Sequence, residues 1–467
     1  MGSADRSVFL TARARGPALS FVLDVFAGDV PMAHIGHAPR TDAWTLAYAA
    51  SWLGDPNAYP LSPALPLIAP LGGYDSRSIK RFIEHLLPEG QALDVAVASH
   101  GLAKSNVFGL IRALGAETAG VLRFRDADNA TTPAEHGMRE IPLTELNARI
   151  ANREMPFSVW DGKVRMSVAG VQDKLLVYLD APLDRGGRMF LVDGPHLAST
   201  HILKPDLGQA ALPHLAINEH FCMTLARHMG LPVADVQLLR APRPVLVVRR
   251  FDRIVQQQDT EIRIGRLHIV DACQACDLPV AFKYERNLGN GPEVRDIRDG
   301  MSFRRLFELE ALTANKAAAK LAMLHWALFQ FLIGNSDAHG KNFSFFVRPG
   351  GFLEPTPWYD LVSVVQYEHF DTELAMAFGD AFTFGEVKGF ALAEFAESCG
   401  IGRKLLQREA KRLAKLAVAA AAELVRSDQY LDSELAFVTR LADFIGQQAQ
   451  RLADYADQAA KIRAEFL

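Results

Sequence analysis

A polar segment between two apolar runs is the first place in this sequence where side chains could do chemistry. It reads FLIGNSDAHGKNFSFF over residues 331–346, and four residues separate Asp337 from Asn342. An apolar helix, predicted over 314–333, ends at Gly334-Asn335, a favourable C-cap pair. Strongly polar side chains between two buried elements cost free energy unless they are paired or functional. A short loop here would present a carboxylate that orients a hydroxyl and an amide that holds a metal ion.

The spacing of Asp337 and Asn342 is that of the catalytic loop of protein kinases, Asp-x-x-x-x-Asn. Spacing alone is weak, and a solvated turn with Asx hydrogen bonds is the plainer interpretation. Asp360, in PWYDLVS, follows the apolar run FSFFV and a Gly-rich turn, where a kinase carries a metal-binding Asp. In isolation Asp360 would be interpreted as a helix N-cap.

Lys204 ends a strand-like segment, THILKP, in apolar surroundings. A kinase needs a lysine on a strand of its small lobe to pair the nucleotide phosphates. Glu219, on a helix predicted over 216–229, could orient that lysine, although Asp206 or Asp173 could serve instead. The plainer interpretation is a lysine that extends its charged end to water.

A possible phosphate loop precedes Lys204 in VRMSVAGVQDK, residues 164–174. Its small residues, Ser167, Ala169 and Gly170, allow a tight loop whose N–H groups could face phosphates. The segment has neither the Walker A nor the Gly-x-Gly-x-x-Gly pattern, so an ordinary hairpin turn is the alternative.

Other chemistry-bearing residues favour structural roles. Cys273-Gln-Ala-Cys276 has no second cysteine pair, so we interpret it as helix packing and not as a zinc site. His325, in an apolar helix, is interpreted as a satisfied core histidine. The basic residues of a helix over 405–425 are interpreted as a solvated face, with a surface for nucleic acid or an acidic partner as the minority alternative.

The whole chain bounds these interpretations. Its 467 residues predict two or three structural units, with a net charge of −4 that excludes a polybasic nucleic-acid coat. We predict units at 1–150, 151–255 and 256–467: a mixed N-terminal unit, a sheet-rich lobe and a helical lobe. Four cysteines fit a reducing cytoplasm. The start of the chain lacks a secretory signal pattern, and the most apolar run, 321–333, is shorter than the roughly 20 residues of a membrane span. A cytoplasmic protein without a membrane segment is therefore expected.

The ordered set of these segments resembles the HipA-type serine/threonine kinases, the toxin half of a bacterial toxin–antitoxin pair. The matching pieces over about 164–363 are SVAGVQDK, HILKP, NEHF, VVRRFDR, RLHIVDACQA, KYE, IGNSDAHGKNFS and YDLVS. LSPALPL and LLPEG, within 61–90, resemble the family's N-terminal subdomain. The resemblance implies an α+β fold: a two-lobed protein-kinase-like core, an N-terminal mixed α/β subdomain and a mostly helical C-terminal lobe.

The resemblance also implies ATP–Mg²⁺-dependent phosphorylation, with Asp337 as the catalytic base and Asn342 and Asp360 as metal ligands. Lys204 matches the phosphate-pairing lysine, and Ser167 the loop serine that the family autophosphorylates. Further positions match nucleotide-contacting segments: Ala169, Gly170, Val171, Gln172, Asp173, Lys174, Arg249, Arg250, Phe251, His339, Lys341 and Tyr359. A phosphate on Ser167 would add about −1.5 to −2 charges beside the nucleotide phosphates and switch the enzyme off.

Two features depart from the family pattern. Arg249 stands where the family often has an acidic residue, so only a main-chain hinge contact to adenine is implied there. The segment 378–388, FGDAFTFGEVK, is not basic, although some members touch operator DNA with the corresponding region. No direct nucleic-acid binding is therefore expected, and operator binding would come from a separate HipB-like DNA-binding antitoxin.

The function expected from sequence is thus a protein serine/threonine kinase toxin. By resemblance, its substrate is a translation component such as an aminoacyl-tRNA synthetase. Two alternatives stay open: a small-molecule kinase, which can use the same Asp and Asn, and a non-catalytic co-repressor or partner-binding subunit.

Overall fold

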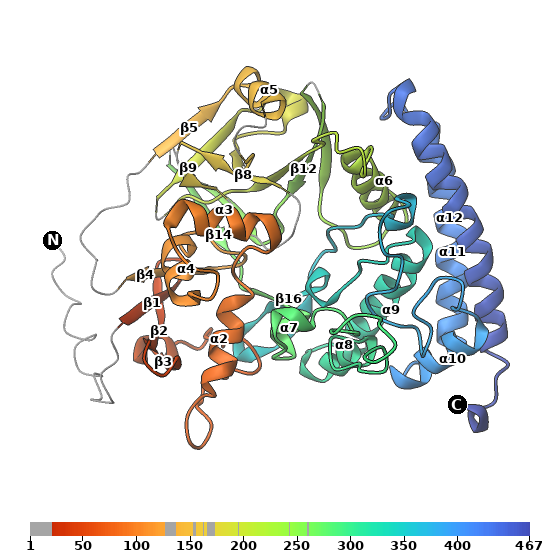
Figure 1. Ribbon diagram of the computed structural model, residues 1–467, viewed down its shortest axis with the longest axis horizontal. Helices are drawn as coiled ribbons and strands as arrows, with labels where there is room; N and C mark the ends of the chain where they lie inside the picture. The colour runs from red at the N-terminus through yellow and green to blue at the C-terminus, as the bar shows by residue number, and fades with distance from the viewer. Residues whose placement is uncertain are drawn as a thin grey trace.

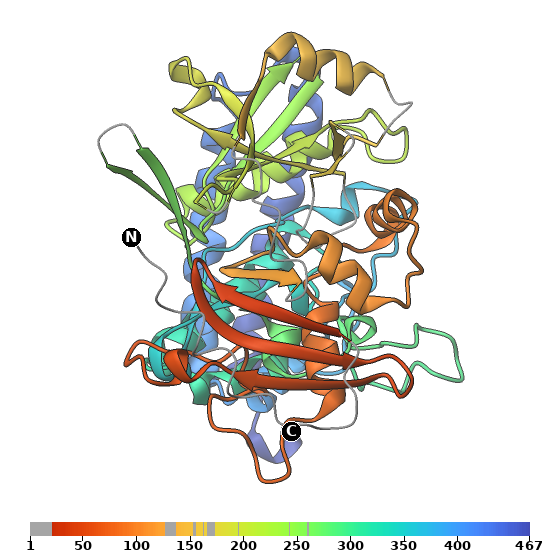
Figure 2. The ribbon, with the colours of Figure 1, turned by 90° about the vertical axis from the view of Figure 1, so that its left-hand side faces the viewer.

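The N-terminal part of the chain forms a four-stranded antiparallel sheet, in the order β3-β2-β1-β4, with short helices beside it. The computed structural model describes residues 21–126, 137–152, 156–161, 163–165, 173–194, 196–241, 243–258 and 261–467. Gly28, with φ 63°, makes the turn predicted between the first two strands. The elements of this unit are β1 (Phe21–Ala27), β2 (Val30–Ala38), β3 (Ala43–Tyr48), α1 (Ala50–Leu53), α2 (Ser76–Glu84), α3 (Gly90–His100), α4 (Val107–Leu114) and β4 (Leu122–Asp126). The turned view shows this sheet in red and orange (Figure 2).

A six-stranded antiparallel sheet, in the order β11-β12-β10-β8-β9-β5, forms the second lobe. Every residue of β8 is buried, because α5 covers one face of the sheet while Tyr178 packs with Phe190 and Ile264 on the other. Such burial on both faces explains the continuous apolar run of the strand. The elements of this lobe are β5 (Gly137–Ile141), α5 (Leu143–Ala151), β6 (Val159–Trp160), β7 (Lys163–Val164), β8 (Leu175–Leu179), η1 (Leu183–Arg185), β9 (Met189–Asp193), β10 (His201–Pro205), α6 (Leu215–His228), β11 (Val236–Ala241), β12 (Arg243–Arg249), β13 (Arg253–Gln258) and β14 (Glu261–Arg266).

The predicted first boundary, at residue 150, does not match this packing. Strand β5 pairs with β9, and Leu146 and Ile150 of α5 belong to the hydrophobic cluster of β8. Both elements therefore lie with the sheet-rich lobe. The polar stretch that suggested a boundary indicated a real change of unit, but the change comes before β5.

The third lobe is mostly helical and carries a small three-stranded sheet, β15-β16-β17. Its long helices α11 and α12 pack against each other along one edge of the molecule (Figure 1). Its elements are β15 (Ile269–Asp271), α7 (Ala272–Ala275), η2 (Val280–Phe282), α8 (Phe303–Glu308), η3 (Leu309–Leu312), α9 (Lys316–Ile333), η4 (Gly340–Asn342), β16 (Ser344–Val347), η5 (Pro349–Gly351), β17 (Leu353–Pro355), η6 (Val364–Gln366), α10 (Gly389–Ser398), α11 (Arg403–Val425), α12 (Asp432–Ala459) and η7 (Ala464–Phe466). Within the described residues, none of the helices has the length and apolar character needed to span a bilayer.

Helix α9 fixes the position of the polar segment after it. The side chain of Asn315 caps its first turn, and the residues from Met323 to Ile333 are all buried. The helix ends at Gly334, whose φ of 68° is the left-handed conformation that glycine adopts without strain. A Cβ at this position would approach the Phe444 ring of α12 to 2.6 Å, so a side chain here would also have to displace that ring.

A buried charge network fastens the N-terminal unit to the segment that joins the two lobes. Asp252 accepts hydrogen bonds from Arg250 at 2.8 Å, Arg253 at 2.7 Å and the Gly120 amide at 2.7 Å. Both arginines also donate to the carbonyl of Thr118. Buried charges persist only when they are paired and hydrogen-bonded, so this network sets where the N-terminal unit sits.

We predict that Asp252→Ala destabilises the protein by about 3–5 kcal/mol, because it leaves two buried guanidinium groups without their shared carboxylate. Urea unfolding followed by circular dichroism measures the change. Asp235→Ala is the matched control: it removes an ion pair with Arg227 on a side chain that is 58% exposed, and its cost should stay below about 1 kcal/mol. Equal losses in the two variants would contradict the assignment.

Candidate functional site

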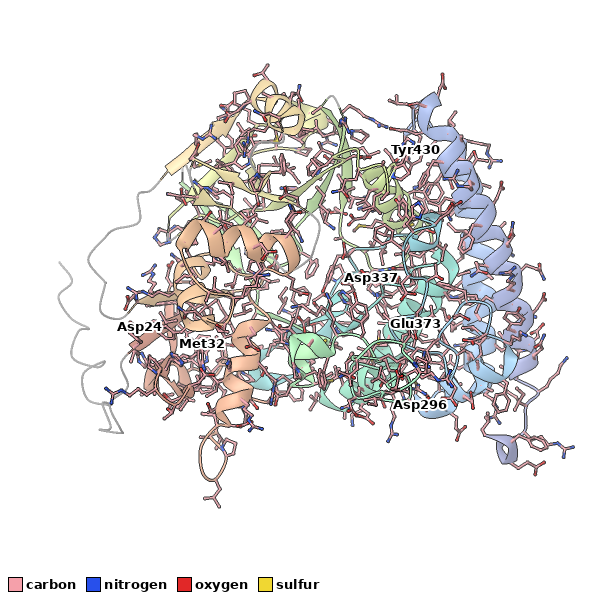
Figure 3. The ribbon with its side chains drawn as sticks, viewed as in Figure 1. Asp24, Met32, Asp296, Asp337, Glu373 and Tyr430 are labelled. Carbon is pink, nitrogen blue, oxygen red and sulfur yellow. The ribbon has the colours of Figure 1, made fainter. Side chains whose placement is uncertain are left out.

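One cleft of about 1390 Å³ lies where the three units meet. Its wall includes Asp337, Asn342, Asp360 and Lys204, the four residues that sequence analysis placed around a phosphoryl group. Figure 3 shows Asp337 in the middle of the molecule, between the lobes. The volume exceeds the range of roughly 300–1,000 Å³ typical of small-ligand pockets, so the cleft has room for a ligand and part of a second molecule.

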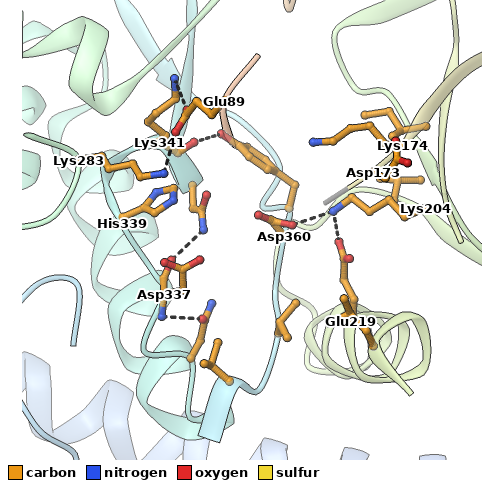
Figure 4. A pocket seen from close by; sticks show the side chains of 18 of the residues that line it. Glu89, Asp173, Lys174, Lys204, Glu219, Lys283, Asp337, His339, Lys341 and Asp360 are labelled. Carbon is orange, nitrogen blue, oxygen red and sulfur yellow. Dashed lines mark hydrogen bonds and ion pairs between the residues drawn. The ribbon is translucent and has the colours of Figure 1, made fainter. Parts of the chain in front are cut away.

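Lys204 lies between two carboxylates in this cleft, on the side opposite Asp337 (Figure 4). Its ammonium donates to Glu219 Oε1 at 2.7 Å and to Asp360 Oδ1 at 2.7 Å. Burial opposes the charged ammonium, but the two carboxylates outweigh it and raise the pKa of Lys204. Of the partners considered for Lys204, Glu219 on α6 is the one that the fold brings to it.

Asp360 adopts a left-handed backbone conformation, with φ 58°, in an extended segment after β17. No helix begins there, so the N-cap interpretation of Asp360 is wrong. Burial alone would raise the pKa of Asp360, but Lys204 lowers it to about 2, which keeps the carboxylate ionised. A non-glycine residue in this backbone region costs free energy and is often found at functional sites.

Asp337 and Asn342 lie at the two ends of the turn that follows α9. The Asn342 side-chain amide donates to the Asp337 carbonyl at 3.1 Å, and the Asp337 amide donates to Asn335 Oδ1 at 3.1 Å. Because the nitrogen of Asn342 is used in this bond, its side-chain oxygen is the atom left for a cation. The turn is therefore an ordered hydrogen-bonded unit that faces the cleft.

Tyr284 is a contact of Asp337 that sequence analysis did not assign. Its hydroxyl donates to Asp337 Oδ1 at 2.7 Å, and its ring meets the His339 ring edge-on at 5.2 Å. Burial, followed by the Asp337 charge, raises the pKa of Tyr284, so the hydroxyl keeps its proton and donates it. One oxygen of the Asp337 carboxylate is thereby fixed.

His339 and Lys341 of the catalytic loop, and Tyr359 next to Asp360, have different surroundings. His339 is buried, burial lowers its pKa, and its Nδ1 has no hydrogen-bond partner among the described residues. Tyr359 donates from its hydroxyl to the Lys341 carbonyl at 2.7 Å. The Lys341 ammonium points to the N-terminal unit, where it lies 3.0 Å from Glu89 Oε1.

The segment predicted as the interlobe hinge lines the cleft, but its three residues differ in use. The guanidinium of Arg250 is taken up by the network around Asp252, and its amide donates to the Thr200 carbonyl. The side chain of Arg249 is 63% exposed and lies 3.6 Å from Asp235. Phe251 packs beside the Tyr359 ring at 5.7 Å and contributes an apolar wall.

The predicted phosphate loop, residues 164–174, is described only at its two ends. Ser167, Ala169, Gly170, Val171 and Gln172 lie outside the described residues. Asp173 accepts hydrogen bonds from the amides of Phe157 and Ser158, so its carboxylate holds a neighbouring turn. Lys174 lines the cleft beside Lys204, and its burial, together with the charge of Lys204, lowers the pKa of Lys174 to about 8.

The charge of the cleft wall fits a polyphosphate accompanied by a divalent cation. Ten Asp and Glu residues and eight Lys and Arg residues line it within the described chain, so the wall has a small excess of negative charge. Mg²⁺ is usually held by one or two protein oxygens together with substrate phosphates. Asp360 and Asn342 supply that kind of donor, and Lys204 and Lys174 supply charges for phosphates.

The other chemistry-bearing residues considered above lie outside the cleft and have packing or ion-pairing roles. His325 bonds Glu409 at 2.9 Å within the packing of α9 and α11, as expected for a satisfied core histidine. Cys273 is buried in α7 and Cys276 is partly buried after it, and burial raises the pKa of both thiols. On α11, Lys411 pairs with Asp457 of α12, and Arg412 pairs with Glu409 of its own helix.

Comparison with known proteins identifies the family. A model of the HipA N-terminal domain matches residues 23–125, and a model of the HipA-like C-terminal domain matches residues 166–424. The chain belongs to the HipA family. It is 40% identical to the serine/threonine-protein kinase toxin HipA of Shewanella oneidensis over 95% of this chain and 99% of that one. A putative kinase of Sinorhizobium fredii is 34% identical over 86% of this chain and 92% of its own length.

A solved structure of the HipA family supports the fold. The Shewanella oneidensis HipA, determined in a complex with HipB and its operator DNA, matches with a TM-score of 0.83 and 39% identity. The match covers 95% of this chain and all of that one. The predicted family, the mixed α and β fold and the classification as a protein serine/threonine kinase are confirmed.

Proposed function

We propose that this HipA-family kinase uses ATP and Mg²⁺ to phosphorylate a serine or threonine hydroxyl of a protein that acts in translation, such as an aminoacyl-tRNA synthetase. The observation that carries the catalytic part is the meeting of Lys204, Asp337, Asn342 and Asp360 in one cleft. The substrate rests on the family resemblance. A HipB-like antitoxin is the proposed partner, because the related Shewanella oneidensis protein occurs in a complex with HipB and operator DNA.

In this mechanism Lys204, held by Glu219, binds nucleotide phosphates, and Lys174 adds a second positive charge beside it. Asp360 and the side-chain oxygen of Asn342 would hold Mg²⁺, and this ion would supply positive charge toward the transferred phosphoryl group. Asp337 orients the acceptor hydroxyl with its free carboxylate oxygen and accepts the proton. Arg249, Phe251, His339 and Tyr359 would line the nucleotide site.

We predict that Asp337→Asn and Asp360→Ala abolish protein phosphorylation, with a loss of at least about a hundredfold, because one removes the base and the other a metal ligand. Transfer of labelled phosphate from ATP measures this. Asp296→Asn, on a side chain that is 92% exposed, is the control and should keep wild-type activity. Full activity of a folded Asp360→Ala protein would contradict the mechanism.

The same assay separates the alternatives. Transfer to a metabolite and to no protein would favour a small-molecule kinase. Unchanged toxicity and partner binding in Asp337→Ala would favour a non-catalytic subunit. A phosphoproteome comparison of cells that express wild type or Asp337→Asn identifies the protein substrate.

We predict that ATP affinity falls about tenfold between pH 7 and pH 9. The pKa of Lys174 is lowered to about 8 by burial and by Lys204, whereas Asp360, Glu219 and Glu89 act in the opposite direction. Nearby phosphates favour the charged ammonium, so Lys174 is expected to stay protonated in the ATP complex. In the ATP-free protein it loses its proton as the pH rises through 8, and binding must then take up a proton. Calorimetric titration with ATP and Mg²⁺ measures the trend. Lys174→Met should bind more weakly and without this pH dependence, and a wild-type affinity that is flat over the range would contradict the role.

We predict that Ser167→Ala retains phosphotransfer and resists self-inactivation. A phosphate on Ser167 would bring about −1.5 to −2 charges toward the nucleotide phosphates and expel the loop. Preincubation with ATP should therefore reduce wild-type activity while the variant stays active. Mass spectrometry tests the site, with Asp337→Asn as the unphosphorylated control. Equal rates of inactivation in wild type and Ser167→Ala would exclude this switch.

A further inference from the structure

A carboxylate of the N-terminal unit reaches into the catalytic lobe. Glu89, the N-cap residue of α3, has a side chain that is only 15% exposed. Its Oε1 lies 3.0 Å from the Lys341 ammonium and its Oε2 lies 2.8 Å from the Lys283 ammonium. Figure 4 shows Glu89 between these two lysines, on the Asp337 side of the cleft. Glu89 thus joins two segments of the catalytic lobe that are far apart in sequence.

The first of these segments is the catalytic loop itself. Lys341 precedes Asn342, and its side chain is 5% exposed. Besides Glu89, its ammonium donates to the Nδ1 of His85 at 3.2 Å and to the carbonyl of His85 at 3.3 Å, both in the N-terminal unit. Asp271, in the catalytic lobe, is more distant at 3.8 Å. The N-terminal unit therefore supplies the three nearest contacts of this buried ammonium, while Asp271 of the catalytic lobe adds a second carboxylate charge.

The second segment holds the catalytic carboxylate. The Lys283 carbonyl accepts a hydrogen bond from the Gly340 amide of the catalytic loop at 3.0 Å, and the Lys283 ammonium lies 5.4 Å from the ring centre of Tyr284. Tyr284 in turn donates to Asp337. A continuous series of contacts thus runs from Glu89 through Lys283 and Tyr284 to Asp337 Oδ1. This is the carboxylate oxygen that accepts the Tyr284 hydrogen bond, so the other oxygen remains for the substrate.

We propose that Glu89 is a positioning residue for phosphotransfer, which sets the catalytic loop through Lys341 and the Asp337 carboxylate through Lys283 and Tyr284. The inference rests on the proposed function and extends it: the N-terminal unit is part of the kinase machinery. A displacement of about 1 Å in a reacting group can lower the rate about a hundredfold. Contacts that hold the catalytic loop and the Asp337 carboxylate in place are therefore expected to raise kcat. Without the Glu89 charge, two lysines would repel each other beside the loop.

Glu89 is not needed to keep the N-terminal unit attached. Ser78 donates to Asp277 at 2.6 Å, Arg81 donates to the same carboxylate at 3.0 Å, and Gly120 is bound to Asp252. The Asp277 contacts join the same two units as Glu89 does, the Asp252 contact holds the segment between the lobes, and none of them touches the catalytic loop. Asp277→Asn is therefore a matched control for Glu89→Gln. Each substitution changes one interfacial carboxylate to an amide, but only Glu89 contacts the catalytic loop.

The test compares phosphotransfer in four full-length variants, with rates normalised to the number of ATP-binding sites found by calorimetry. We expect Glu89→Gln to lower kcat by about tenfold to a hundredfold with little change in the KM for ATP, and Glu89→Asp to restore part of the loss. Tyr284→Phe should lower kcat similarly. Asp277→Asn should change kcat by less than about twofold, even where it lowers the melting temperature.

A double variant separates positioning from a general structural role. If Glu89 acts through Tyr284, Glu89→Gln with Tyr284→Phe loses less activity than the product of the two single losses. Multiplicative losses, or a kcat of Glu89→Gln within about twofold of wild type, would overturn the proposal. Should Glu89→Gln not fold, Lys283→Met tests the same bridge from its other end, and a normal kcat there would overturn the proposal equally.

The outcome also distinguishes this inference from the proposed function. If wild type transfers phosphate and Asp337→Asn does not, the kinase mechanism stands, and the kcat of Glu89→Gln then decides the positioning role alone. If wild type transfers no phosphate to any protein, the proposed function fails.

Discussion

The cleft depends on the charge of Lys204. An ammonium removed from water is costly unless carboxylates surround it, and two do: Glu219 on α6 and Asp360 after β17. These contacts tie a strand and a helix of the sheet-rich lobe to a segment of the helical lobe. Pairing of this buried charge thus constrains how the two lobes meet. It acts together with the apolar cluster that runs from α6 and β12 into the helical lobe.

The N-terminal unit completes the same cleft from a third side. Its loop at Thr118–Gly120 is bound to the segment between the lobes, and His85 and Glu89 are bound to the catalytic loop. Both attachments are buried and charged, so neither can open without exposing or isolating charges. The catalytic loop, which would otherwise depend on the helical lobe alone, is thus held by two units.

How much of this the sequence could predict depended on how local each feature is. The turn from Asp337 to Asn342 was predictable because a C-cap, a polar turn and a strand follow one another directly. Lys204 was found on its strand, but its pairing with Glu219 stayed one of three alternatives, since a sequence does not show which carboxylate a helix turns inward. Tyr284 was missed because it lies 53 residues from Asp337 in the sequence. Glu89 was missed because it lies 194 residues from Lys283 and still farther from Lys341. The boundary at residue 150 failed for a similar reason: only the pairing of β5 with β9 places β5 in the second lobe.

The exposure of the two carboxylates beside Lys204 gives them different roles. The side chain of Glu219 is 1% exposed, whereas that of Asp360 is 41% exposed toward the cleft. A solute in the cleft can therefore compete for Asp360 but not for Glu219. If a cation takes the Asp360 carboxylate, Lys204 stays compensated by Glu219 and its ammonium turns its remaining hydrogen-bonding capacity to the anion that accompanies the cation. Lys174, which lines the cleft beside Lys204, adds a second positive charge for that anion. Asp360 and these two lysines therefore offer places for a cation and for an anion in the same cleft.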